Sequence, residues 1–206
     1  MRNLMIILLG VALSFSVRGQ DETLVGGKIE SGGYGGPVIK IGQLNGETSV
    51  FIGGQGGWII NHRFVLGGKG YASVMPAAVD GLDNIVVGFA SGGAFFEYIL
   101  HSNKLLHLSF ENMMGYGIVY NDVGNYRDGH DPIDYTGDGC FVLEPGINLN
   151  VNVSKLFRVG AGVTYRYVNG ANYNPGAPYI NRTYETISDS DLGGFSAQIV
   201  FKIGMF

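Results

Sequence analysis

Residues 146–168, GINLNVNVSKLFRVGAGVTYRYV, decide the fold of this chain, because their side chains alternate in chemical character. Before Ser154 and Lys155, Ile, Leu and Val alternate with asparagines; after them, Val, Ala and Tyr alternate with Arg, Gly and Thr. A period of two is typical of β-strands with two unlike faces. The pattern alone leaves open which face meets water, since a soluble sheet buries its apolar face and a membrane barrel turns that face to lipid.

The same alternation recurs along the chain and predicts eight strands. We expect them at 37–44, 48–60, 64–74, 84–100, 105–120, 141–153, 157–169 and 192–205. Most of these exceed the roughly 9–11 residues that cross a bilayer when tilted, whereas a strand of a soluble domain has about 5–6. An even strand number is what bacterial closed barrels require. The predicted fold class is all-β, an eight-stranded antiparallel up-and-down transmembrane β-barrel.

The connections between these strands alternate in length. Those at 61–63, 101–104 and 154–155 are short, those at 75–83, 121–140 and 170–191 are long, and 45–47 is a tight hairpin with an Asn-Gly turn signal. Short turns on one side and long loops on the other are typical of outer-membrane barrels, with the long loops outside the cell.

The two strand faces differ in composition. One phase carries Val50, Ile52, Trp58, Ile60, Phe64, Leu66, Phe96, Tyr98, Leu100, Leu106, Leu108, Phe110, Met114, Tyr116, Ile118, Phe141, Leu143, Ile147, Phe195, Ile199, Phe201, Ile203 and Met205. The other carries a polar set that includes Lys69, Glu97, His107, Glu111, Glu144, Arg158, Arg166 and Lys202. Eight strands enclose too little room for so many large apolar side chains. We therefore predict that the apolar phase faces lipid and that the polar phase forms a lumenal network, in which the glutamates pair with Lys69, Lys202 and the two arginines. Gly115, Gly117, Gly160 and Gly162 share the polar phase and leave room for the long side chains.

The amino end has the form of a secretory signal peptide, with Arg2, an apolar run over residues 4–15 and small residues near Gly19. We expect a signal peptide at 1–19, a Gly-rich periplasmic segment at 20–36 and the barrel at 37–206. Removal of Arg2 and Arg18 leaves 11 basic against 17 acidic residues, a net charge of −6, so nucleic acid is not an expected partner. Cys140 is the only cysteine, so no internal disulfide forms. The sequence predicts no cofactor and no metal site.

The mature chain resembles the small eight-stranded outer-membrane β-barrel proteins of Gram-negative bacteria. The segment ESGGYGGPVIKIGQLNG and the ending IVFKIGMF look similar to barrels of the Bacteroidota type. The resemblance implies residence in the cell outer membrane after export, with outer-membrane lipid and the barrel-assembly machinery as partners. Phe206 resembles the terminal aromatic signal read by that machinery, yet it falls in phase with Lys202 and Gly204 and not with the apolar face.

Three places could carry chemistry or contacts. His107, Ser109 and Glu111 share one strand face, a spacing similar to the His-x-Ser of outer-membrane lipid A deacylases, but same-face neighbours lie about 6.6 Å apart along a strand, too far for direct hydrogen bonds. The loop at 121–140 is acidic, and Asp128, His130 and Asp131 are candidate contacts, although its spacing does not match a calcium loop. The loop at 170–191 offers Tyr173, Tyr179 and Tyr184 as contacts for another envelope protein or a glycan.

The sequence therefore favours a non-enzymatic outer-membrane protein with a structural or interaction role through its extracellular loops. Three alternatives stay open: a narrow pore or transport protein, a lipid A-modifying enzyme, and a soluble periplasmic β-barrel carrier.

Overall fold

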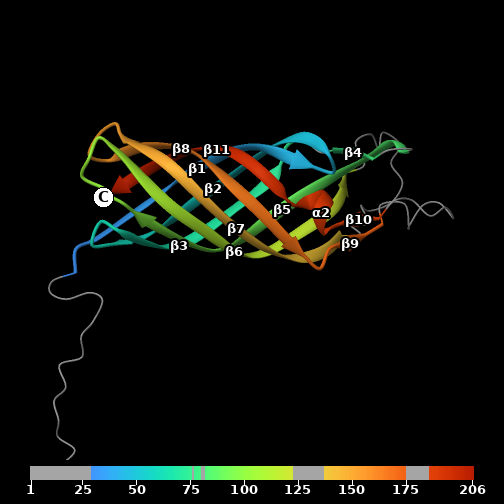
Figure 1. Ribbon diagram of the computed structural model, residues 1–206, viewed down its shortest axis with the longest axis horizontal. Coiled ribbons are helices and arrows are strands. Elements are labelled where there is room, and N and C mark those ends of the chain that lie inside the picture. Colours follow the sequence, from blue (N-terminus) through green and yellow to red (C-terminus); the bar gives the residue numbers. More distant parts are fainter. Residues whose placement is uncertain (1–28, 76, 80–81, 123–136, 175–185) are drawn as a thin grey trace, which may run out of the picture.

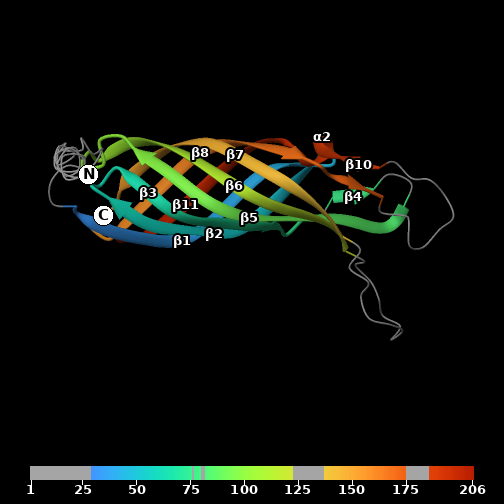
Figure 2. The ribbon, with the colours of Figure 1, turned by 90° about the horizontal axis from the view of Figure 1, so that it is seen from below.

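The computed structural model describes residues 29–75, 77–79, 82–122, 137–174 and 186–206, and these form a closed antiparallel β-barrel. Its eight long strands are β1 (Ser31–Leu44), β2 (Glu47–Ile60), β3 (Phe64–Ser73), β5 (Leu82–Ile99), β6 (Leu106–Asp122), β7 (Gly137–Asn152), β8 (Phe157–Asn169) and β11 (Gly194–Met205). Each strand pairs with its neighbours in chain order, β1 pairs with β11, and the sheet is continuous around the barrel. Figures 1 and 2 show the strands tilted around a long barrel. The predicted up-and-down fold is confirmed.

The eight predicted strands all form, but two begin at least four residues earlier than expected. Strand β1 begins at Ser31 and β7 at Gly137, so residues 31–36 belong to the barrel and not to the N-terminal segment predicted to end at 36. The segment SGGYGG shows no alternation of apolar and polar residues, because glycine has no side chain, so the sequence pattern did not predict a strand there. At Gly36 a Cβ atom would lie 1.9 Å from the carbonyl oxygen of Phe201 on β11, so only glycine allows this approach of the two strands.

The two barrel ends differ in their connections, as predicted. Residues 29 and 206 lie at one end, which we call the terminal end, with the turns at 61–63, 100–105 and 153–156 (Figure 1). The opposite end, which we call the loop end, carries the other ends of the eight strands and the turn at Asn45 and Gly46, whose φ values of +50° and +77° suit a two-residue hairpin.

Short elements fold at the loop end. They are β4 (Ala77–Val79), which extends the sheet beside β5, the pair β9 (Asn172–Tyr173) and β10 (Ile187–Ser188), and the helix α2 (Asp189–Leu192). The carbonyl of Asp191 accepts a hydrogen bond of 2.7 Å from the backbone N–H of Asn45, which ties α2 to the β1–β2 turn. In the described part of the chain, no helix is long and apolar enough to cross a membrane.

The barrel interior contains two apolar clusters and a set of buried polar side chains. A loop-end cluster contains, among others, Phe51, Phe89, Met113, Val142 and Leu192. A terminal-end cluster contains Tyr34, Ile59, Val65, Phe95 and Ile99, with Phe206 packed against it. The buried polar side chains are interleaved with these clusters: Glu97 lies between Phe95 and Ile99 on β5, and Tyr71 of the loop-end cluster donates to Glu144.

Candidate functional site

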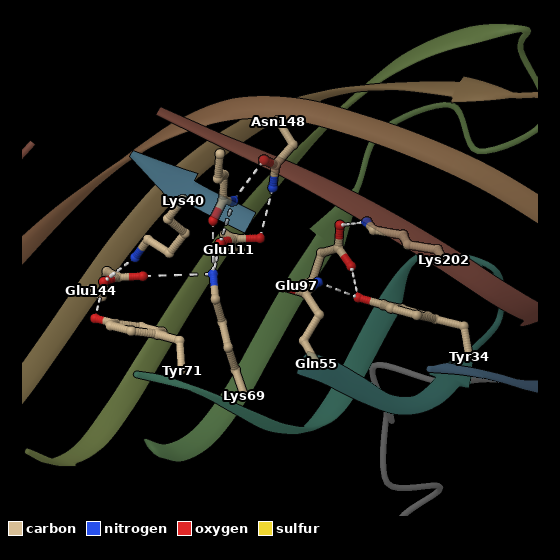
Figure 3. Close-up of polar contacts among 11 residues, drawn as sticks. Tyr34, Lys40, Gln55, Lys69, Tyr71, Glu97, Glu111, Glu144, Asn148 and Lys202 are labelled. Carbon is tan, nitrogen blue, oxygen red and sulfur yellow. Dashed lines mark hydrogen bonds and ion pairs between the residues drawn. The ribbon is translucent and has the colours of Figure 1, made fainter. Parts of the chain in front are cut away.

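The larger of two lumenal ion-pair clusters surrounds Glu111 and Glu144. Lys69 Nζ lies 2.5 Å from Glu111 Oε1 and 3.6 Å from Glu144 Oε1, so it bridges the two carboxylates. Lys40 Nζ lies 2.5 Å from Glu144 Oε2, to which the Tyr71 hydroxyl also donates at 2.5 Å. The four charged side chains come from β1, β3, β6 and β7 and meet inside the barrel, as Figure 3 shows.

Two amides complete the partners of Glu111. Asn148 Nδ2 donates to Glu111 Oε2 at 2.7 Å, and Gln198 Nε2 donates to Glu111 Oε1 at 2.9 Å. Gln198 also accepts from Lys69 at 3.1 Å through its Oε1 atom. Room for Asn148 comes from Gly162 on the next strand, where a Cβ atom would lie 2.3 Å from the Asn148 Oδ1 atom.

The second cluster surrounds Glu97, nearer the terminal end. Lys202 forms an ion pair with Glu97 Oε1, and the Tyr34 hydroxyl donates to Glu97 Oε2 at 2.7 Å. Tyr34 in turn accepts a hydrogen bond of 2.9 Å from Gln55 Nε2. Figure 3 shows this group beside the larger cluster.

The ionic charges of the two clusters balance. Three lysines, Lys40, Lys69 and Lys202, face three glutamates, and the side chains in these ion pairs are at most 3% exposed. Burial of an unpaired charge is costly, so such an interior holds together only when each carboxylate has a cation and further donors. The arrangement has the chemistry of a structural network, with its donors and acceptors directed at one another.

The two arginines do not join the carboxylates as the sequence predicted. In the described residues Arg166 donates to the carbonyls of Leu192 at 2.5 Å and Gln43 at 2.8 Å, near the loop end, with Phe51 and Phe89 on its faces. Arg158 lies at the terminal end with its guanidinium 3.9 Å from the ring centre of Phe206. Both arginines face inward as expected, but their partners are carbonyls and aromatic rings.

His107, Ser109 and Glu111 are not assembled as a catalytic triad. His107 contacts the carbonyl of Lys104 at 3.3 Å, and Ser109 accepts a hydrogen bond of 2.9 Å from Asn150. Glu111 is occupied by Lys69 and the two amides. The three side chains share a face but serve separate contacts, because β-strand spacing keeps them apart.

The predicted loop contacts are mostly outside the described residues, which is the case for Asp128, His130, Asp131, Tyr179 and Tyr184. Tyr173 is described, and the expectation that it lies on an exposed loop surface is wrong. It is 5% exposed and packs in the loop-end cluster together with Ile187, its partner in the β9–β10 pair. Within the described ranges, no group of three or more His, Cys, Asp or Glu side chains is placed to hold a metal ion.

Sequence reasoning missed three members of the network: Tyr34, Lys40 and Tyr71. Lys40 stands between Ile39 and Ile41, so the strand period alone places it opposite two outward residues. Tyr71 shares the phase of Lys69 and is 5% exposed. Tyr34 lies in the glycine-rich start of β1, where the alternation has no apolar residues to define it.

The outer surface of the barrel is apolar. From Leu106 to Tyr120 the outward positions of β6 hold Leu, Phe, Asn, Met, Tyr and Ile, none of them charged. The most exposed of the large apolar side chains on the outward phase have exposed fractions between 39% and 72%. Among these are Ile39 and Ile41 on β1, Trp58 on β2, Phe96 on β5 and Phe195 on β11. A surface of this extent far exceeds the apolar patches of water-soluble monomers.

Comparison with known proteins gives the fold. The chain is similar to the solved structure of neisserial surface protein A, with 11% identity over 87% of this chain and 99% of that one and a TM-score of 0.52. It is also similar to the N-terminal β-barrel domain of Pseudomonas aeruginosa OprF, with 9% identity over 86% and 100% of the two chains and a TM-score of 0.49. No protein-family model and no curated protein sequence matches the chain.

The chain is thus a closed eight-stranded up-and-down barrel with a polar, filled interior and an apolar exterior. More particularly, it has the fold of the small eight-stranded barrels solved from bacterial outer membranes. The 11% sequence identity shows a shared fold and no more.

Proposed function

We propose that this chain is an integral outer-membrane protein without enzymatic activity, whose barrel is a rigid anchor and whose long loops contact partners. The observation that carries the proposal is the combination of an apolar outer surface with a filled interior. The exterior suits lipid, because transmembrane barrels turn an uncharged apolar band outward. The interior is occupied by charge-balanced side chains and two apolar clusters, so the chemistry available to partners lies at the barrel ends.

The loop end is the contact surface in this proposal. Residues 121–140 are rich in Asp and include Asp128, His130 and Asp131, and residues 170–191 include Tyr179 and Tyr184. Acidic and tyrosine-rich loops on a rigid scaffold suit recognition of another envelope protein or a glycan. Outer-membrane lipid and the barrel-assembly machinery are the other partners we expect.

The filled lumen argues against the alternative of a pore. The side chains of Lys40, Glu97 and Glu144 are fully buried, as are those of Phe51 and Phe89 in the loop-end cluster. An open channel would leave such groups wet, and eight strands enclose little more than their own side chains.

Heat-modifiability tests the barrel in its membrane. Protein extracted from outer membranes is run on a gel with and without boiling, and a mobility shift is expected because closed barrels stay folded in the gel detergent until they are heated. Absence of the shift, with the protein in the soluble periplasmic fraction, would overturn the proposal and turn the apolar face into a core or ligand pocket.

Epitope insertion tests the orientation. A tag inserted between residues 128 and 131 is expected to bind antibody on intact cells, because the proposal places the loop end outside. The matched control carries the same tag between Ser154 and Lys155, at the terminal end, and is expected to bind antibody only after the outer membrane is opened. Labelling of the control tag alone on intact cells would refute the orientation.

A further inference from the structure

An open recess lies at the terminal end of the barrel, next to the Glu97 cluster, because Phe206 in its wall stacks on Tyr34. Its volume is about 760 Å³, and it is walled by the turns that follow β2 and β5, together with Arg158 from β8 and Phe206. That size is typical of a small-molecule site. The recess opens at the barrel rim, because its wall includes Ile99 from the lumenal face and Tyr98 and Leu100 from the outward phase.

The recess is lined by positive charge. Arg63 and Arg158 contribute guanidinium groups, His62 and His101 contribute imidazoles, and none of the residues that line it is Asp or Glu. The acid nearest in the contacts is Glu30, whose Oε2 lies 2.6 Å from His62 Nε2 and which is not part of the wall. His62 is thus paired with an acid, while Arg63, Arg158 and His101 line the concave site without one, an arrangement that attracts an anion.

Arg158 is the strongest indication of a ligand. It is 8% exposed, yet in the described residues its guanidinium has no hydrogen bond and no ion pair, only the ring of Phe206 at 3.9 Å. The other buried arginine, Arg166, donates to two carbonyls. No Arg158 nitrogen is among the buried atoms that lack a hydrogen-bond partner, so its donors reach solvent, and the recess that Arg158 lines is the side from which an acceptor can arrive.

The backbone at the rim supports this placement. Four non-glycine residues in the described chain have positive φ, and three of them, Asn61, His62 and His101, line the recess with values of +51°, +56° and +53°. Non-glycine residues with φ in this region are uncommon and cost free energy. The strained turns carry the two histidines into the wall of the recess.

We propose that this recess binds a phosphate group, held by Arg158 at its base and by Arg63 and the two histidines at its rim. Phosphate matches the site better than a carboxylate does, because its multiple oxygens and up to two negative charges suit two guanidinium groups. Two sources share this chemistry. The rim position of Tyr98 and Leu100 suits a phospholipid headgroup of the adjacent leaflet, and the open mouth suits a soluble phosphate compound.

The test uses the full-length protein in dodecyl maltoside micelles, which contain no phosphate. The side-chain Nε–Hε resonance of Arg158 is followed by NMR during titration with inorganic phosphate, with sodium chloride at equal ionic strength as reference, and separately with phosphatidylglycerol added to the micelles. We expect a saturable shift with one of the phosphate probes. A shift with inorganic phosphate identifies a soluble ligand, and a shift with phosphatidylglycerol alone identifies a lipid headgroup.

Variants locate the site. Arg158→Gln is expected to weaken binding at least about tenfold, followed by calorimetry, because it removes charge-assisted hydrogen bonds. Arg63→Gln, at an exposed turn where folding is not at risk, is expected to weaken it about two- to fivefold. Lys104→Gln is the matched control, since Lys104 belongs to the same turn as His101 and Asn103 but does not line the recess. Unboiled gel mobility checks that each variant is folded.

Three results would overturn the proposal. They are an Arg158 resonance that neither probe moves, a shift that sodium chloride reproduces, and a loss of affinity in Lys104→Gln equal to that in the two arginine variants. Each would mean that the recess attracts anions only through net charge or does not hold them.

Discussion

Neutralising Glu144 tests whether charge balance holds the barrel interior together. Glu144→Gln keeps the shape of the side chain but leaves Lys40 and Lys69 with one carboxylate, Glu111, between them. Lys40 lies 2.5 Å from the lost charge and is fully buried, so no water can replace it. Removal of one partner from a buried ion pair costs about 3–5 kcal/mol. The upper half of that range is expected here, because Glu144 also accepts the Tyr71 hydroxyl.

The double variant Lys40→Met/Glu144→Gln separates charge imbalance from lost packing. Lys40→Met alone leaves one lysine against two carboxylates, so we expect it also to destabilise, by about 2–4 kcal/mol. In the double variant Lys69 and Glu111 remain as a balanced pair. The double variant is therefore expected to cost less than the two single variants added together, with a coupling of about 2 kcal/mol or more.

The assay is urea unfolding in lipid vesicles, followed by the fluorescence of Trp58. Trp58 is the only tryptophan and is 49% exposed on the outer face, so it reports transfer from lipid to water. Glu30→Gln is the matched control, because Glu30 pairs with His62 at 2.6 Å but both side chains are about half exposed or more, and its loss is expected to cost below about 1 kcal/mol. If the double variant loses as much stability as the two single variants added together, within about 0.5 kcal/mol, the view that Lys40 and Glu144 balance each other is refuted.

Three further variants test the two faces of the barrel. Gly162→Val is expected to lower stability by about 2 kcal/mol or more in the same unfolding assay, because even a Cβ atom would lie 2.1 Å from a backbone oxygen and would collide with Asn148; unchanged stability would contradict the close packing. Ile199→Arg, midway along β11 on the outer face, is expected to cost about 2–4 kcal/mol, and Phe195→Arg near the loop end about 0–1 kcal/mol, so equal costs would speak against a membrane around the barrel. Cys140, 2% exposed, is expected to resist a water-soluble maleimide until urea unfolds the barrel, and rapid labelling of the folded protein in a mass-spectrometric assay would show that the loop-end cluster is open.

The alternation of the sequence was enough to predict the barrel and its two faces. Each side chain of β6 from Leu106 to Ile118 lies on the face that the period assigned, because the strand period of two is fixed by backbone geometry. The start of β1 was not predictable in the same way. Its glycines show no alternation, and they are needed for close contacts with β11 that become visible only when the barrel closes.

The pairing inside the lumen could not be read from the sequence. Lys40 on β1 and Glu144 on β7 belong to strands that do not pair, so they meet across the lumen and not along the sheet. The period places both side chains inward but says nothing about which opposite groups come within reach. For the same reason the expected partnership of the glutamates with Arg158 and Arg166 was wrong, since both arginines lie nearer the barrel ends.

The order of charges along the lumen has a physical reason. The lysine–glutamate pairs are buried among the residues of the two apolar clusters, where no water can solvate an unpaired charge. Arg166, which has no carboxylate among the described residues, lies where the carbonyls of Gln43 and Leu192 reach it. Arg158 lies where the terminal recess opens. The two arginines thus lie at opposite ends of the lumen, Arg166 bound to carbonyls and Arg158 beside an open site, where its donors are accessible to a ligand.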